Sequence, residues 1–136
     1  MVHCEIHYTG GLRNRASHGP SGVEIVTDAP VDNRGKGESF SPTDLVGVAL
    51  GTCVLTLMGI AAQDLGRDLP HAKASVEKKM KATPMRHIGK LTLVIEIGGA
   101  WNAEERAKLE EAALGCPVRA SLGERTEVDM RFVWEA

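Results

Sequence analysis

The 136-residue sequence is short of three things: net charge, cysteine and aromatic side chains. Its formal net charge is −2 and its Lys and Arg residues are scattered, so we expect neither a nucleic-acid partner nor binding to anionic lipid. It has only three cysteines and no CxxC pair, which argues against a zinc knuckle or a disulfide scaffold. The thiols are therefore either reactive or merely buried.

The N-terminal segment also lacks the apolar run of a secretory signal peptide. Residues 1–10 read MVHCEIHYTG, with polar side chains where a signal peptide needs apolar ones. We therefore expect a cytoplasmic protein whose thiols start reduced. No linker or internal repeat is visible, and a chain of this length buries about two thirds of its unfolded surface. Residues 1–136 are accordingly predicted to form a single domain.

What the sequence does have is one long apolar stretch, residues 42–66. Ser41 is suited to the N-cap of a helix and Pro42 to its first position. Asp44 would lie in the first turn, and Gly66 would end the helix. Such a helix would be roughly 37 Å long. We expect a helix that long and that apolar to be buried.

Residues 45–62 contain no charged side chain, so a membrane span has to be considered. The flanking residues argue against it, because Asp44 and Asp64 are acidic, no run of positive residues is nearby and no aromatic belt is present. We therefore predict a central helix covered by sheet, and no membrane partner.

Segments of alternating polarity predict strands on both sides of this helix. The predicted strands span residues 2–9, 12–17, 23–27, 72–81, 88–97 and 126–134. Asn102 and Glu105 form a capping box for a second helix, which ends at Leu114. Cys116 and Pro117 begin a third, short helix. The resulting order β-β-β-α-β-β-α-α-β predicts an α+β domain.

The first predicted strand has two different faces. His3, Glu5 and His7 share one face and could ligate a metal, but they lack a fourth ligand, so we expect a solvated face and no metal. Cys4 lies on the opposite, apolar face and is expected to be a buried structural thiol. Nothing in the sequence indicates a nucleotide, a flavin or another cofactor.

Cys53 and Cys116 occupy different contexts, and thiol chemistry requires the thiolate. Cys116 lies at a predicted helix N-terminus, which favours a lowered pKa for its thiol. Cys53 lies in the middle of the apolar helix, where burial favours the neutral thiol. It therefore needs a cation, for which Arg13 and Arg15 are candidates. On spacing alone, two buried bystander thiols fit the sequence as well as a reactive pair.

Two sequence blocks contain these cysteines: FSPTDLVGVALGTCVLTLMGIAA around Cys53, and GCPVRASL, whose Cys116 comes 63 residues later. The blocks resemble the OsmC/Ohr family of osmotically induced and organic hydroperoxide resistance proteins. The segments YTGGLRNRASH and GKGESFSPTDL are also similar, so the resemblance covers nearly the whole chain. It implies an OsmC-like fold and an intertwined homodimer, in which long central helices are enclosed by sheets from both chains.

The resemblance also implies a chemistry. Cys53 would be the peroxidatic residue, whose thiolate attacks an organic hydroperoxide, releases the alcohol and becomes a sulfenic acid. Cys116 would be the resolving residue, forming a disulfide that an external dithiol, of lipoyl or thioredoxin type, reduces. The implied function is a thiol-dependent peroxidase in oxidative stress defence. The alternatives are a non-catalytic protein that binds a small molecule or senses redox state, and a purely structural dimer.

In the family, an arginine and a carboxylate hold the peroxidatic thiolate. Arg13 matches the arginine, with Arg15 as its rival. The glutamate expected after the helix-opening proline is Thr43 here, and the next acidic residue is Asp44. Asp44 would lie roughly 13.5 Å along the helix from Cys53, so it could reach a thiolate only on the partner chain. This pattern resembles a less characterised branch of the family.

Overall fold

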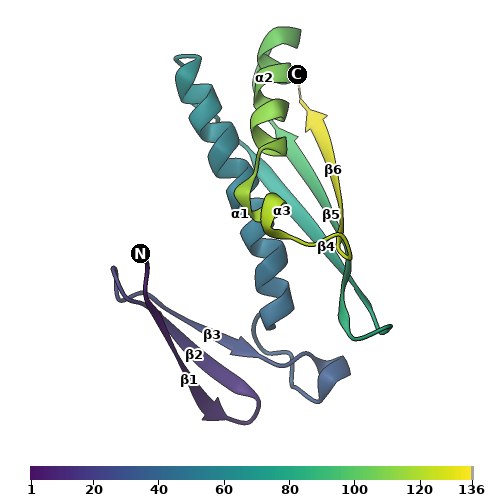
Figure 1. Ribbon diagram of the computed structural model, residues 1–136. Helices are drawn as coiled ribbons and strands as arrows, with labels where there is room; N and C mark the ends of the chain where they lie inside the picture. The colour runs from purple at the N-terminus through teal and green to yellow at the C-terminus, as the bar shows by residue number, and fades with distance from the viewer. Residues whose placement is uncertain (136) are drawn as a thin grey trace. The chain divides into compact units, whose positions relative to one another are not determined.

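The computed structural model describes residues 1–135, which divide into two compact units, Met1–Val46 and the segment from Gly47 on. The observed order of elements confirms the predicted order β-β-β-α-β-β-α-α-β and the α+β class (Figure 1). The elements are β1 (Cys4–Gly10), β2 (Arg13–His18), β3 (Glu24–Asp28), the 3-10 helix η1 (Val31–Asn33), α1 (Pro42–Asp64), β4 (Lys73–Lys81), β5 (His87–Ile97), α2 (Ala103–Leu114), α3 (Pro117–Ser121) and β6 (Glu127–Trp134).

The first unit is an antiparallel meander in the order β1-β2-β3, followed by a loop that contains η1. The register places Arg13 of β2 opposite Asp28 of β3. The backbone N–H of Asp28 donates to the carbonyl of Phe40 at 3.0 Å, so the two ends of the loop are tied together. Gly35 permits this closure, because a Cβ there would lie only 1.7 Å from the carbonyl oxygen of Ala29.

The start of α1 is fixed by a reciprocal cap. The backbone N–H of Asp44 donates to the Ser41 hydroxyl at 3.1 Å, and the Asp44 carboxylate accepts from the Ser41 backbone N–H at 2.9 Å. Pro42 occupies the first helical position, and Gly66, with a φ of +71°, follows the end of the helix. The predicted start and end signals of this helix are confirmed.

The second unit is a sheet in the order β4-β5-β6, with helices on one face (Figure 1). β4 and β5 form an antiparallel hairpin, whereas β6 pairs parallel to β5 after the crossover through α2 and α3. The unit has its own hydrophobic core between sheet and helices. Its fully buried apolar side chains include Leu50, Val54 and Met58 of α1, Leu91, Leu93, Ile95 and Ile97 of β5, and Leu109 and Ala113 of α2.

In the single chain, the expected burial of α1 is observed along one face only. Its buried residues recur every three or four positions and form one face, comprising Gly47, Leu50, Gly51, Val54, Met58 and Ala62. Only 33% of its most apolar 18-residue window is buried, although the mean hydropathy there is 2.2. Its length and composition would allow it to cross a membrane, and the core helices of soluble proteins share both properties.

The predicted burial of Cys4 is also wrong, since Cys4 is exposed. Cys4 lies on the apolar face of the β1–β3 sheet, and this face is exposed in the single chain. Ile6, Ala16 and Ile25 form one row across that sheet, yet Ile6 is 65% exposed and Ile25 is 47% exposed. In the single chain, this apolar face lacks the cover that the strand pattern led us to expect.

Candidate thiol site

The fold brings Cys53 and Cys116 together, although 63 residues separate them in the sequence. Cys53 lies in the middle of α1, and Cys116 lies between α2 and α3. Both belong to the second unit, and the Cys53 side chain is near enough to Cys116 to affect its pKa. Both are free thiols. Two neighbouring free thiols are candidates for disulfide chemistry.

Local signals hold Cys116 in this position. α2 ends at Leu114, and the backbone N–H of Gly115 donates back to the last turn of that helix. Cys116 is then the N-cap of α3, as predicted, with Pro117 at the first helical position. Its Sγ accepts the backbone N–H of Arg119 at 3.5 Å, and the residue is only 1% exposed.

The predicted lowering of the Cys116 pKa is wrong, because burial raises the pKa of this thiol. The interaction with Cys53 raises the pKa further, whereas the backbone N–H groups of Arg119 and Val118 lower it less. α3 has only five residues and begins with Pro117, which has no N–H, so its N-terminus offers few donors. Cys116 is therefore a neutral thiol at neutral pH.

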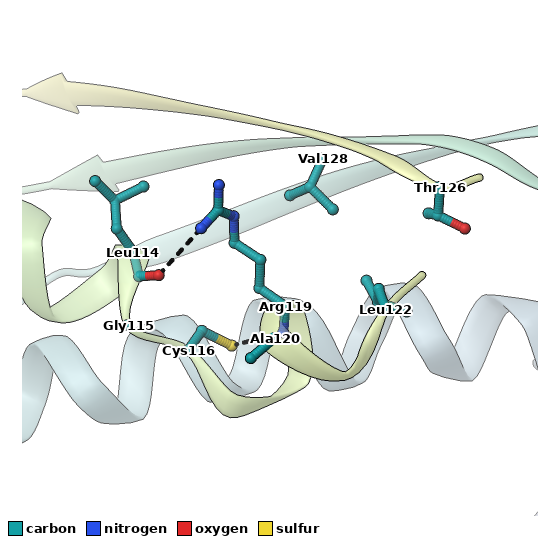
Figure 2. Close-up of a pocket in the computed structure, with 8 residues that line it drawn as sticks. All are labelled: Leu114, Gly115, Cys116, Arg119, Ala120, Leu122, Thr126 and Val128. Atoms are coloured by element: carbon teal, nitrogen blue, oxygen red, sulfur yellow. Dashed lines mark hydrogen bonds between the residues drawn. The ribbon is translucent and has the colours of Figure 1, made fainter. Parts of the chain in front are cut away.

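A cavity of about 290 Å³ lies beside Cys116 (Figure 2). Leu114, Leu122 and Val128 supply apolar walls, and Arg119 supplies the one charged side chain among the lining residues. Figure 2 shows the guanidinium of Arg119 reaching toward the carbonyl of Leu114, to which it donates at 3.3 Å. The cavity could hold a small organic molecule that carries a polar group.

The first unit contains a second polar cluster, centred on Arg13. Nη2 of Arg13 lies 2.5 Å from Oε1 of Glu38 and 3.5 Å from Oδ2 of Asp28. The same Oδ2 accepts the backbone N–H of Glu38 at 2.9 Å. That N–H is the largest cause that holds the pKa of Asp28 below its ordinary value; burial opposes it, and Arg13 adds to it.

Arg15, the alternative arginine, has a different environment on the same strand. Its Nε lies 2.9 Å from Oε2 of Glu24, and both side chains are about half exposed. Such exposed pairs hold their geometry weakly. Of the two candidate arginines, Arg13 is the one that contacts a buried carboxylate.

The residues that open α1 serve its cap. The carboxylate of Asp44 accepts the backbone N–H of Ser41, and the Thr43 hydroxyl lies 3.3 Å from that of Ser41. The orienting role expected of Asp44 stays a prediction. Asp28 and Glu38 were not identified from the sequence, although the register of the predicted meander contained a signal, since it pairs Asp28 with Arg13.

The possible metal site on the first strand has no counterpart in the structure. Among residues 1–135, no three His, Cys, Asp or Glu side chains are grouped so that they could hold a metal ion. His3, Glu5 and His7 are all exposed.

A family model described as OsmC-like protein matches residues 35–131, more than two thirds of the chain. The chain belongs to the OsmC-like protein family. The matched range of this OsmC-like protein includes Cys53 and Cys116, whereas Arg13 and Asp28 precede it. No curated protein sequence matches the chain.

Solved structures agree with this assignment. A protein from Psychrobacter arcticus, provisionally named an osmotic stress induced and detoxification response protein, is 37% identical, with a TM-score of 0.89 over 99% of this chain and 96% of its own. An organic hydroperoxide resistance protein OsmC from Legionella pneumophila is 18% identical, with a TM-score of 0.79 over 98% and 96%. OhrB of Bacillus subtilis is 16% identical, with a TM-score of 0.63 over 99% and 98%. At the lower identities, the likeness establishes the OsmC-like fold alone.

Proposed function

We propose that this OsmC-like protein is a cysteine-based peroxidase that reduces organic hydroperoxides to alcohols in oxidative stress defence. The observation that carries the proposal is that the free thiols of Cys53 and Cys116, far apart in the sequence, lie near enough to interact. A cavity large enough for a small organic molecule lies beside Cys116. Similar folds include proteins named for organic hydroperoxide resistance.

The proposed reaction has three steps. The Cys53 thiolate attacks the distal oxygen of the hydroperoxide, the O–O bond breaks, and the alkoxide takes a proton and leaves as the alcohol. Cys53 is now a sulfenic acid. The Cys116 sulfur attacks the Cys53 sulfur, the S–O bond breaks, and water leaves with the Cys116 proton. An external dithiol of lipoyl or thioredoxin type then reduces the disulfide by exchange and is itself oxidised.

The environment of Cys116 supports this division of roles. Because burial raises its pKa, Cys116 is held as the neutral thiol and does not compete with Cys53 for peroxide. Its proximity to Cys53 supports the resolving role. We assign stabilisation of the Cys53 thiolate to Arg13. Asp44 remains a candidate for the carboxylate that orients an arginine, at the thiolate of the partner chain.

We further propose that the protein acts as a cytoplasmic homodimer. Two observations support a partner chain: the exposed apolar face of the β1–β3 sheet, and the long apolar helix α1, which is buried along one face only. A second copy that covered both would supply the burial that the sequence pattern leads us to expect. The small net charge favours no nucleic-acid or membrane partner.

Intact-mass spectrometry of the reduced protein after one equivalent of cumene hydroperoxide tests the reaction. We expect the wild-type protein to lose two hydrogens, Cys116→Ser to accumulate a trappable sulfenic acid, and Cys53→Ser to stay unchanged. Cys4→Ser is the matched control and should react like the wild type. Hydrogen peroxide in parallel shows the preference for organic substrates.

A wild-type protein that stays reduced under these conditions would overturn the peroxidase. The non-catalytic alternative then becomes the better hypothesis, because the cavity with Arg119 could bind a small molecule without turnover. The presence of Thr43 in place of the family glutamate favours a non-catalytic protein. Ligand screening by thermal shift would follow.

A further inference from the structure

Asp28 is a buried carboxylate in which one oxygen accepts hydrogen bonds and the other accepts none from the described residues. Its side chain is 1% exposed. Oδ2 accepts from the backbone N–H of Glu38 and from Arg13, whereas Oδ1 is buried without a hydrogen-bond partner among the described residues. An unsatisfied buried oxygen is costly, so such a group calls for a reason other than stability.

Arg13 uses only one of its guanidinium nitrogens as a hydrogen-bond donor to the described residues. A guanidinium carries five N–H donors in a rigid plane. The hydrogen bonds to Asp28 and Glu38 both come from Nη2. Within residues 1–135, the structure gives Nε and Nη1 no partner, so these donors remain for a third anion. A carboxylate that holds Nη2 therefore sets the direction in which the others point.

The two carboxylates differ in how firmly they are held. Glu38 is 59% exposed and follows Gly37, whose φ is +63°. Asp28 ends β3 directly opposite Arg13, is almost fully buried and is anchored by a backbone N–H. Glu38 makes the shorter contact with Arg13, 2.5 Å against 3.5 Å, but an exposed side chain holds its geometry weakly, whereas Asp28 is fixed by burial and by the Glu38 N–H. Asp28 is therefore the side chain able to impose a fixed orientation on Arg13.

We propose that Asp28 is the positioning residue for Arg13, taking the place that the family resemblance gives to the glutamate replaced here by Thr43. The inference rests on the proposed function, in which Arg13 stabilises the Cys53 thiolate. Asp28 acts through Arg13 alone and does not touch the reacting atoms. Glu38, at the solvent side of the guanidinium, has the smaller effect.

The test is the pH dependence of Cys53 alkylation by iodoacetamide in a Cys4→Ser, Cys116→Ser background, where Cys53 is the single thiol. We expect Asp28→Asn and Arg13→Gln each to raise the midpoint of the profile by about one pH unit, which is about tenfold slower alkylation near neutral pH. The double variant should shift no further, because both changes remove the same interaction.

Glu24→Gln is the matched control, since it removes the carboxylate from Arg15 in the same sheet. We expect its profile to match that of the parent protein. Asparagine keeps an oxygen for the Glu38 N–H, so Asp28→Asn should fold, as thermal melting will show. If it does not, Asp28→Ser, which is smaller and keeps a hydroxyl acceptor, gives the same comparison.

Three results would overturn the inference: an unchanged midpoint in Asp28→Asn, full additivity in the double variant, or an equal shift in Glu24→Gln. Additivity would mean that Asp28 acts on its own. These profiles need no peroxide, so they can fail while the proposed peroxidase stands. Failure of the peroxidase shows separately, as absence of oxidation by cumene hydroperoxide.

Discussion

Each of the two sheets of this protein has an apolar face, but the two faces differ in how far they are buried. The β4–β6 sheet packs against helices of its own unit, and Leu91, Leu93, Ile95 and Ile97 on its central strand are fully buried. The β1–β3 sheet has a shorter apolar row, in which Ile6 and Ile25 remain exposed. The second unit therefore has a core of its own, whereas the apolar row of the first is exposed in the single chain.

The two units also differ in the direction in which they shift the pKa of a buried ionisable group. Asp28 in the first unit and Cys116 in the second are each 1% exposed. Hydrogen bonds and a cation outweigh burial at Asp28 and lower its pKa, whereas burial outweighs two N–H groups at Cys116 and raises its pKa. The sign of each shift is set by the donors available and not by depth alone.

The difference in cover predicts unequal costs of truncation. Ile95→Ala should lower the free energy of unfolding by about 2–5 kcal/mol, because Ile95 is fully buried in a packed core. Ile25→Ala should cost under about 1 kcal/mol at a protein concentration low enough to keep the chain monomeric. Urea unfolding at fixed low concentration measures both. Equal costs would mean that the first sheet is covered within the monomer.

A charge on the exposed face of the β1–β3 sheet tests whether a second copy covers it. In the proposed homodimer, Ile6→Asp should weaken dimerisation at least about 100-fold, because an unpaired carboxylate would be buried under the partner chain. His7→Asp, on the opposite face of the same strand, is the control and should leave the dimer intact. Sedimentation equilibrium measures the dissociation constants. If Ile6→Asp still dimerises like the wild type, this face is not the interface.

The sequence was enough to predict the features that depend on neighbours in the chain. The Ser41 and Asp44 cap of α1, the Asn102 and Glu105 capping box and the cap of α3 by Cys116 all follow from residues three or fewer positions apart. The β1–β3 meander also followed, because short turns join its strands. Local signals of this kind are readable without a structure.

What the sequence did not predict depends on contacts between distant segments. The parallel pairing of β6 with β5 requires the crossover through α2 and α3. The pKa of Cys116 was expected to fall because its helix N-terminus is visible in the sequence, while its burial is not. Asp28 gave no signal by itself, since its role appears only when β2 and β3 pair and the loop returns Glu38.

The Cys116 environment predicts a loss of stability at alkaline pH. The folded state raises the pKa of this thiol, so the contribution is complete below the ordinary thiol pKa of about 8.5 and is lost as pH rises through the raised value. Urea unfolding between pH 7 and pH 10 should show a falling free energy in the wild type. Cys116→Ser should have a shallower slope, and an identical slope would contradict the raised pKa.

The Asp28 environment predicts the opposite dependence, on the acid side, with a smaller effect. Because the folded state lowers the pKa of Asp28, its contribution is complete above the ordinary value of about 3.9 and is lost as pH falls through the lowered one. Asp28→Asn should therefore flatten the loss of stability in acid. Asp129→Asn, which breaks the partly exposed pair with Arg131, should not. If both variants reduced the acid-induced loss of unfolding free energy equally, the hydrogen-bond donors around Asp28 would not be its cause.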